Sequence, residues 1–293
     1  MRAWPAVRCP DIGDHYRSEE SGVGDEFRGG VDDLAGGLER FGCFCRAGLL
    51  GRVERVFELV PSAAQAAGGS QGRAELGPDD FLDEVDAPLV VRNEKGQRLC
   101  ETQVGQRYGR WKVSANTTNI YSPRLAGVEF LRLAATSGWR YSDGSSGPPC
   151  RGRFISETYP YATLVGAAEL GYDTERPRYK RKPPHLPVAQ WRAERAANCD
   201  ILIRRLGQLA DADSPLLLQS HPVTKELTEQ ASPISDSAYK HREDLIDALL
   251  CAWTASLWVR HSFDRCQVLG LPADPTSEPA TTMIVPARPE QRP

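Results

Sequence analysis

The chain has 293 residues and a formal net charge of −3, with 40% hydrophobic and 26% charged residues. This composition is ordinary for a globular protein with a sizeable core. The slight excess of acid argues against a protein that coats nucleic acid through bulk positive charge, so a nucleic-acid substrate would need a local basic patch or bridging metal ions.

Signals for membranes, secretion and structural zinc are not found in the sequence. No run of about 18 apolar residues occurs, and no apolar signal peptide follows Met1. The eight cysteines are scattered and form no C-x-x-C pair. We therefore expect reduced thiols in a cytoplasmic protein rather than a zinc site.

Residues 1–77 are predicted to be poorly ordered or degenerate. Glycines and charges interrupt most of their apolar runs. The exception is residues 49–60, whose apolar positions recur at helical spacing until Pro61 ends the pattern.

From Phe81 onward, strand and helix patterns alternate, and they predict an α/β domain over residues 78–265. The strand patterns are residues 81–91, interrupted at Pro88, and 153–159. The helical patterns are residues 124–138, 161–170, 190–210 and 239–261. The basic, proline-rich stretch 172–187 is predicted to be an exposed loop, and residues 266–293 a disordered proline-rich tail.

The segment EDLIDALLCAW, residues 243–253, carries two acids at helical spacing. Asp244 and Asp247 lie three residues apart, so on a helix they project from the same face. Two carboxylates so close repel each other, and a divalent cation that prefers oxygen ligands removes the repulsion. The competing interpretation is a solvated helix start, where acids interact favourably with the macrodipole. Spacing alone favours that simpler interpretation.

Two further acids each follow an apolar strand and precede a proline nearby. Asp86 stands in EVDAPL and Glu157 in ISETYP. In α/β proteins, sites usually form at the edge of the sheet where parallel strands end. Taken alone, Asp86 is more simply an Asp that caps the next turn. The recurrence of one acid at each strand end is more informative than either acid by itself.

Basic residues are candidates for contacts with a substrate. Arg178 and Lys180 flank Tyr179, and this mixture of charge and aromatic ring suits phosphates and stacked bases. A solvated run of charge is nevertheless the simpler interpretation of that loop. Arg98 is preferred as the partner of Glu101 in a structural ion pair. No P-loop, G-x-G-x-x-G or G-x-S-x-G motif occurs in the chain.

The order of these motifs resembles the domain of unknown function 429 family. The resemblance covers roughly residues 80–260, and five short motifs in the expected order make chance agreement improbable. The motifs are VDAPLVVRNEKGQRLCE, NTTN, ISETYPYATL, RYKRK and HREDLIDALLCAWTA.

The resemblance implies a particular α/β fold, an RNase H-like mixed sheet flanked by helices, and it implies a nuclease that acts on DNA or RNA. In such enzymes, carboxylates hold Mg²⁺ or Mn²⁺ ions that activate water and stabilise the leaving oxygen. The implied metal ligands are Asp86, Glu157, Asp244 and Asp247. The implied substrate-binding residues are Lys180, Arg178 and Arg98. Nothing indicates the oligomeric state.

The chain departs from this fold at the first strand, which normally carries its own acid within an apolar run. The nearest candidate is GVDD, residues 30–33, whose flanks are charged and rich in glycine. A second interpretation is therefore a catalytically inert RNase H-like module that binds nucleic acid or a partner protein. A third is a phosphoryl-transfer enzyme of the actin-like ATPase type, which the lack of a glycine-rich phosphate loop disfavours.

Overall fold

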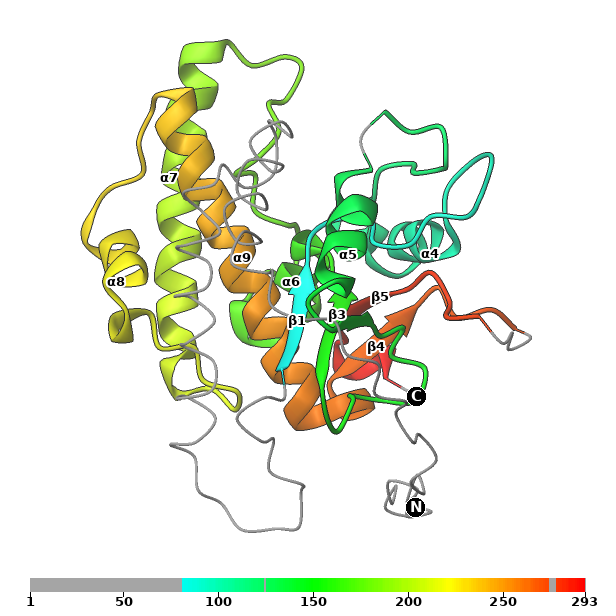
Figure 1. Ribbon diagram of the computed structural model, residues 1–293. Coiled ribbons are helices and arrows are strands. Elements are labelled where there is room, and N and C mark those ends of the chain that lie inside the picture. The colour runs from blue at the N-terminus through cyan, green and yellow to red at the C-terminus, as the bar shows by residue number, and fades with distance from the viewer. Residues whose placement is uncertain (1–80, 124, 274–277, 293) are drawn as a thin grey trace, which may run out of the picture. The chain divides into compact units, whose positions relative to one another are not determined.

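Three parallel strands form the sheet that carries the candidate site. The computed structural model describes residues 81–123, 125–273 and 278–292 (Figure 1). The strands of the sheet are β1 (Phe81–Val85), β2 (Trp139–Tyr141) and β3 (Arg153–Glu157). Their order is β1-β3-β2, and Val85 lies opposite Glu157. The carboxyl ends of β1 and β3 therefore lie at the same level.

The helices follow the apolar periodicity of the sequence in their central parts. They are α4 (Leu99–Tyr108), α5 (Ala126–Ala135), α6 (Pro160–Gly166), α7 (Val188–Gly207), α8 (Pro222–Glu229) and α9 (Asp236–His261). The predicted α5, α6, α7 and α9 are confirmed with shifted ends, as is the strand β3. The strand β1 is confirmed as well, but it ends at Val85 rather than at residue 91. An α/β architecture is thus observed in the described part of the chain.

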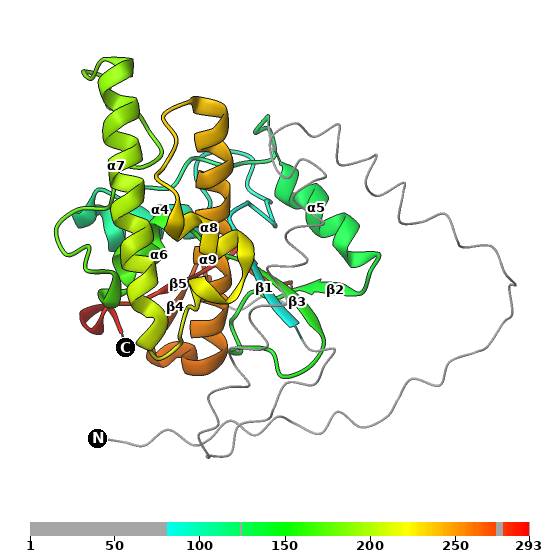
Figure 2. The ribbon, with the colours of Figure 1, turned by 90° about the vertical axis from the view of Figure 1, so that its left-hand side faces the viewer.

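The long helices α7 and α9 run side by side in both views (Figure 1 and Figure 2). Helix α9 also packs against β1, β5 and α6. Its buried face repeats every fourth residue, with Leu245, Leu249, Trp253 and Leu257 all turned into the core. This packing fixes the position of the acids on α9 relative to the end of β1.

Two helices were not predicted from the sequence. In α4 the buried apolar side chains are Cys100, Val104 and Tyr108, one per turn, and the intervening residues are polar. In α8 only eight residues are helical, and the helix starts at Pro222 after His221, whose side chain accepts a hydrogen bond from the Val223 N–H at 3.2 Å. Neither apolar pattern is long enough to be recognised as a helix from the sequence alone.

The prediction of a disordered tail over residues 266–293 is wrong for the residues described there. Strands β4 (Cys266–Leu269) and β5 (Met283–Pro286) form an antiparallel pair. Ile284 and Val285 are 0% exposed, and the Thr158 hydroxyl donates to the Ile284 carbonyl at 2.7 Å. Strand β5 was not recognised in the sequence because proline-rich sequence surrounds it. Its apolar side chains nevertheless complete the core.

The basic stretch 172–187 is a loop, as predicted, but it is not uniformly exposed. Tyr179 is 0% exposed, and Tyr172 is also buried. The Tyr179 carbonyl accepts a hydrogen bond from the Tyr239 hydroxyl at 2.7 Å. The loop is therefore anchored in the core by its aromatic residues, while its charged side chains lie nearer the surface.

Several predictions lie outside the described residues: the ordering of residues 1–77, the helix at 49–60 and the candidate strand at 30–33. All described residues belong to one compact unit. Within that described part, no helix has both the length and the apolar character needed to cross a membrane.

Candidate metal centre

Asp86 is the first residue after β1, and Glu157 is the last residue of β3. Because β1 and β3 are parallel neighbours, both acids stand at the same edge of the sheet. The Asp86 side chain is 30% exposed, whereas Glu157 is 2% exposed. The strand-end position predicted for both acids is confirmed, but their surroundings differ.

Glu157 is held in a buried ion-pair network. Arg98 donates to both of its oxygens, from Nη1 at 2.7 Å and from Nη2 at 2.6 Å. The Leu89 N–H donates to Glu157 Oε2 at 3.1 Å, and Arg98 Nε donates to Glu101 at 2.9 Å. The predicted Arg98–Glu101 pair is confirmed, and it extends to an acid 59 residues further along the chain.

This network leaves neither Arg98 nor Glu157 facing solvent. The Arg98 side chain is 1% exposed and that of Glu157 2%. Burial raises the pKa of Glu157 to about 7, and the hydrogen bonds and charge of Arg98 oppose that rise. A metal-ligand role for Glu157 and a substrate-binding role for Arg98 stay predictions, and each would require the network to open.

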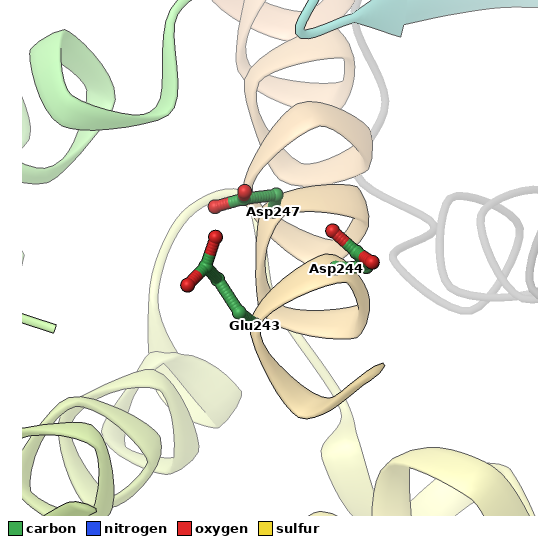
Figure 3. A group of neighbouring side chains, drawn as sticks. All are labelled: Glu243, Asp244 and Asp247. Atoms are coloured by element: carbon green, nitrogen blue, oxygen red, sulfur yellow. The ribbon is translucent and has the colours of Figure 1, made fainter. Parts of the chain in front are cut away.

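The acids on α9 form a close group (Figure 3). One carboxylate oxygen from each of Glu243, Asp244 and Asp247 lies within 4.8 Å of the others. In Figure 3, Glu243 and Asp247 turn to one side of the helix, one turn apart, and Asp244 projects from the adjoining face. Lys240 neutralises part of this charge, since its Nζ lies 3.0 Å from Glu243 Oε1 and 2.6 Å from Asp244 Oδ1.

Lys180 joins the strand-end acid to the helix acid. Its Nζ lies 2.6 Å from Asp247 Oδ2 and 3.6 Å from Asp86 Oδ2. The side chains of Lys180 and Asp247 are 16% and 14% exposed, so the pair is shielded but not sealed from water. The structure thus brings together Asp86, Asp247 and Lys180 from three separate segments.

Aromatic rings surround this lysine and orient its partner. The Tyr179 hydroxyl donates to Asp247 Oδ1 at 2.9 Å. The ring centroids of Tyr161 and Tyr179 lie 5.4 Å apart in an edge-on arrangement. Lys180 Nζ lies 5.2 Å and 5.4 Å from these two centroids, within the range of a cation–π interaction.

The electrostatics of the site follow from partial burial of like charges. Burial raises the pKa of Asp86 to about 6, the charge of Lys180 opposes the rise, and the charge of Asp247 adds to it. Burial also raises the pKa of Glu243. Burial lowers the pKa of Lys180, but Asp247 and Asp86 outweigh that effect and leave it raised. The Lys180 ammonium therefore stays charged, and Asp86 and Asp247 compete for this one cation.

The donor set fits a hard divalent cation. Glu243, Asp244 and Asp247 offer carboxylate oxygens within 4.8 Å of one another, the ligands that Mg²⁺ and Mn²⁺ prefer. Asp86 lies outside this close group and shares Lys180 with Asp247. The Lys180 ammonium already stands between two of these acids, which marks the place between them as favourable for positive charge. The residues that would hold the ion are thus Asp86 and the α9 acids.

Glu243 and Tyr179 belong to the site but were not singled out from the sequence. Glu243 precedes Asp247 by four residues, and that spacing on a helix was a usable signal. Tyr179 lies beside Lys180 in the RYKRK motif. Its contact with Asp247, 68 residues away, could not be read from local spacing.

The residues predicted to contact a substrate differ in their exposure and in their partners. Lys180 lies inside the acid cluster, whereas Arg178 is 45% exposed and pairs with Glu175 at 2.7 Å. Arg181 donates to the Asn116 side chain at 2.6 Å. The exposed face of the loop therefore presents the guanidinium groups of Arg178 and Arg181 close in sequence to the partly exposed Lys180.

Comparison with known proteins adds a family to this geometry. A model of a family of proteins of unknown function, DUF429, matches residues 82–276. The chain belongs to this family. The matched residues contain all the elements that supply the candidate site, from the end of β1 to α9. The family description carries no activity. No curated protein and no solved structure matches the chain.

Proposed function

We propose that this DUF429 protein is a divalent-metal-dependent nuclease that hydrolyses phosphodiester bonds in DNA or RNA. The observation that supports the proposal most directly is the convergence of Asp86, from a strand end, and Asp247, from α9, on one cation, Lys180. The resemblance of the motifs to the DUF429 family, which implies an RNase H-like nuclease, supports it as well. An RNase H-like arrangement of the whole sheet is part of the proposal.

The proposed ligands of Mg²⁺ or Mn²⁺ are Asp86, Asp247 and Glu243, with Asp244 beside them. Glu157 would join them only by giving up its hydrogen bonds from Arg98. When bound, the ion would act as a Lewis acid on the phosphate and lower the pKa of water.

The chain's own residues would position the substrate around that ion. Tyr179 holds Asp247 in one orientation through its hydroxyl, so that oxygen Oδ2 faces the site. Arg178, on the exposed side of the loop, is placed to attract phosphate oxygens. Tyr161 and Tyr179 pack around Lys180 and limit the access of water to the acids.

The test is a cleavage assay on single- and double-stranded DNA and RNA with Mn²⁺ or Mg²⁺. Asp247→Asn removes a ligand charge and is expected to lower cleavage at least about a hundredfold. Titration calorimetry with Mn²⁺ should show weaker binding in the same variant. Asp236→Asn is the matched control, since it makes the same change on the same helix at a residue that pairs with Arg192 and Arg195.

Measurable Mn²⁺ binding without cleavage of any of these nucleic acids would contradict the nuclease proposal. That outcome would favour the second candidate, a catalytically inert module that binds nucleic acid or a partner protein. One observation favours this alternative: Asp247 and Glu157 already have basic partners in Lys180 and Arg98. A gel-shift assay without metal would then detect nucleic-acid binding with no products.

A further inference from the structure

We propose that Lys180 is a built-in counter-ion that competes with the divalent metal for the same carboxylate oxygens. The inference rests on the proposed metal centre and makes Lys180 a positioning residue that sets its metal affinity. In the metal-free protein Lys180 neutralises Asp86 and Asp247, and metal binding requires its ammonium to leave them.

The hydrogen bonds of Asp247 decide which oxygen a metal can use. Oδ1 accepts from the Tyr179 hydroxyl at 2.9 Å. This hydrogen bond occupies Oδ1 and leaves Oδ2 without a hydrogen bond from Tyr179. Oδ2 is then the oxygen left for a cation, and it is the one that Lys180 Nζ contacts at 2.6 Å.

A metal ion and the Lys180 ammonium cannot comfortably share this oxygen. A bound Mg²⁺ lies roughly 2.1 Å from its oxygen ligands, and Lys180 Nζ lies 2.6 Å from Oδ2. The two cations would then be less than about 5 Å apart, where their repulsion in a partly buried site is strong. Asp86, the second acid at Lys180, would face the same choice between the two cations.

Lys180 has a route out of the cluster. Its side chain is 16% exposed, and its neighbours in the loop, Arg181 and Lys182, are exposed. The backbone beside it is fixed, because the Tyr179 carbonyl accepts from the Tyr239 hydroxyl. Displacement therefore needs a change of side-chain rotamer and no movement of the loop. A displaced ammonium would point to the side from which a phosphodiester approaches.

The experiment compares Mn²⁺ binding by titration calorimetry in the full chain and in Lys180→Met. Methionine keeps an apolar side chain beside the Tyr161 and Tyr179 rings and removes the charge. We expect the Kd for Mn²⁺ to fall about tenfold or more. In EDTA, the Tm of the variant should be lower than that of wild type, because Asp86 and Asp247 lose their counter-ion. Added Mn²⁺ should raise the variant's Tm more than the wild type's.

Two matched variants separate competition from a general effect of charge. Lys182→Met removes a positive charge two residues away, where Nζ donates to the carbonyls of Pro183 and Leu186 at 3.1 Å and 3.0 Å. It should leave the Kd for Mn²⁺ within about twofold of wild type, because exposed charges are screened. Lys180→Arg keeps the charge and should not tighten binding.

The outcomes distinguish this inference from the proposed function. Unchanged or weaker Mn²⁺ binding in Lys180→Met overturns the inference while leaving the metal centre standing. Equal tightening in Lys182→Met overturns it as well, because the effect would then be nonspecific. If neither wild type nor Lys180→Met binds Mn²⁺, the metal centre fails and the inference falls with it. Binding seen only in Lys180→Met supports the inference.

Discussion

At the scale of single residues, Asp86 is held in surroundings that disfavour its own charge. Asp86 directly follows β1, and one lysine is shared between it and Asp247. Burial raises its pKa to about 6 from a usual value of 3.8. Placing such groups together costs folding free energy, which is common where a site is arranged for function.

The pKa of Asp86 predicts how stability changes with pH. A carboxyl whose pKa is raised in the folded state binds its proton more tightly when folded, so the protein loses stability as pH rises from about 4 to about 6. Asp86→Asn mimics the protonated group and should be as stable as wild type near pH 4. At pH 7.5 we expect it to be more stable by about 1–2 kcal/mol, after a reduction for the 30% exposure of the side chain.

Urea denaturation in EDTA at the two pH values measures this difference. Asp236→Asn is a control of opposite sign, because hydrogen bonds from Arg192 and Arg195 lower the pKa of Asp236. Its carboxylate stabilises the fold above the unfolded-state pKa, so the variant should be the less stable protein at pH 7.5. A destabilised Asp86→Asn at pH 7.5 would show that the charge of Asp86 is a net benefit to folding.

At the scale of elements, α5 sets the position of the segment that carries Asp86. Gly127 in α5 packs directly on Ala87 and Pro88, the residues that follow Asp86. A Cβ at Gly127 would lie 2.4 Å from the Pro88 carbonyl oxygen and 2.9 Å from the Ala87 Cβ. Only glycine permits so close an approach between this helix and the strand end.

Gly127→Ala is therefore expected to destabilise the protein by about 1–3 kcal/mol, because the added methyl group forces α5 away from Pro88. It should also weaken Mn²⁺ binding, since the movement reaches Asp86. The control is Gly105→Ala in α4, where no atom lies within 4 Å of the new Cβ. In an open helical position this change normally stabilises by about 0.5–1 kcal/mol. Thermal unfolding measures the stability of both variants, and titration calorimetry measures their Mn²⁺ binding. A Gly127→Ala variant more stable than wild type would refute the close contact between α5 and Pro88.

At the scale of the whole described unit, strand β5, near the end of the described residues, packs against elements that carry the candidate site. Strand β5 contacts α6, α9 and β3. The Tyr108 hydroxyl of α4 donates to the Pro286 carbonyl. The residues after Gly270 thus tie together the elements that carry Glu157, Asp247 and Tyr161.

Ile284→Ala tests this role of β5. The Ile284 side chain is 0% exposed, and its truncation is expected to cost about 2–5 kcal/mol in the free energy of unfolding. Glu290→Ala is the control, because Glu290 forms an exposed ion pair with Arg110, and exposed pairs contribute little to stability. Equal urea midpoints for wild type and Ile284→Ala would mean that β5 does not belong to the cooperative core.

The sequence by itself determined the elements whose signals are local. The apolar repeat of residues 239–261 identified α9, and the acids at the strand ends were found because an apolar run, an acid and a proline follow one another. The order of the five motifs was sufficient to indicate the DUF429 family, which matches residues 82–276. These features depend on neighbours within one or two turns or on the alternation of a single strand.

Tertiary structure alone decided which partner each acid has. Glu157 and Asp86 have the same sequence setting, yet Glu157 receives Arg98 from 59 residues away and Asp86 shares Lys180 with Asp247. Residues 283–286 become a strand only because β4 pairs with them. A hydrogen bond or ion pair between distant segments forms through packing of the whole unit, and no local pattern encodes it. The acids of the candidate metal centre could thus be picked out from the sequence, with the exception of Glu243, whereas their pairing with Lys180 could not.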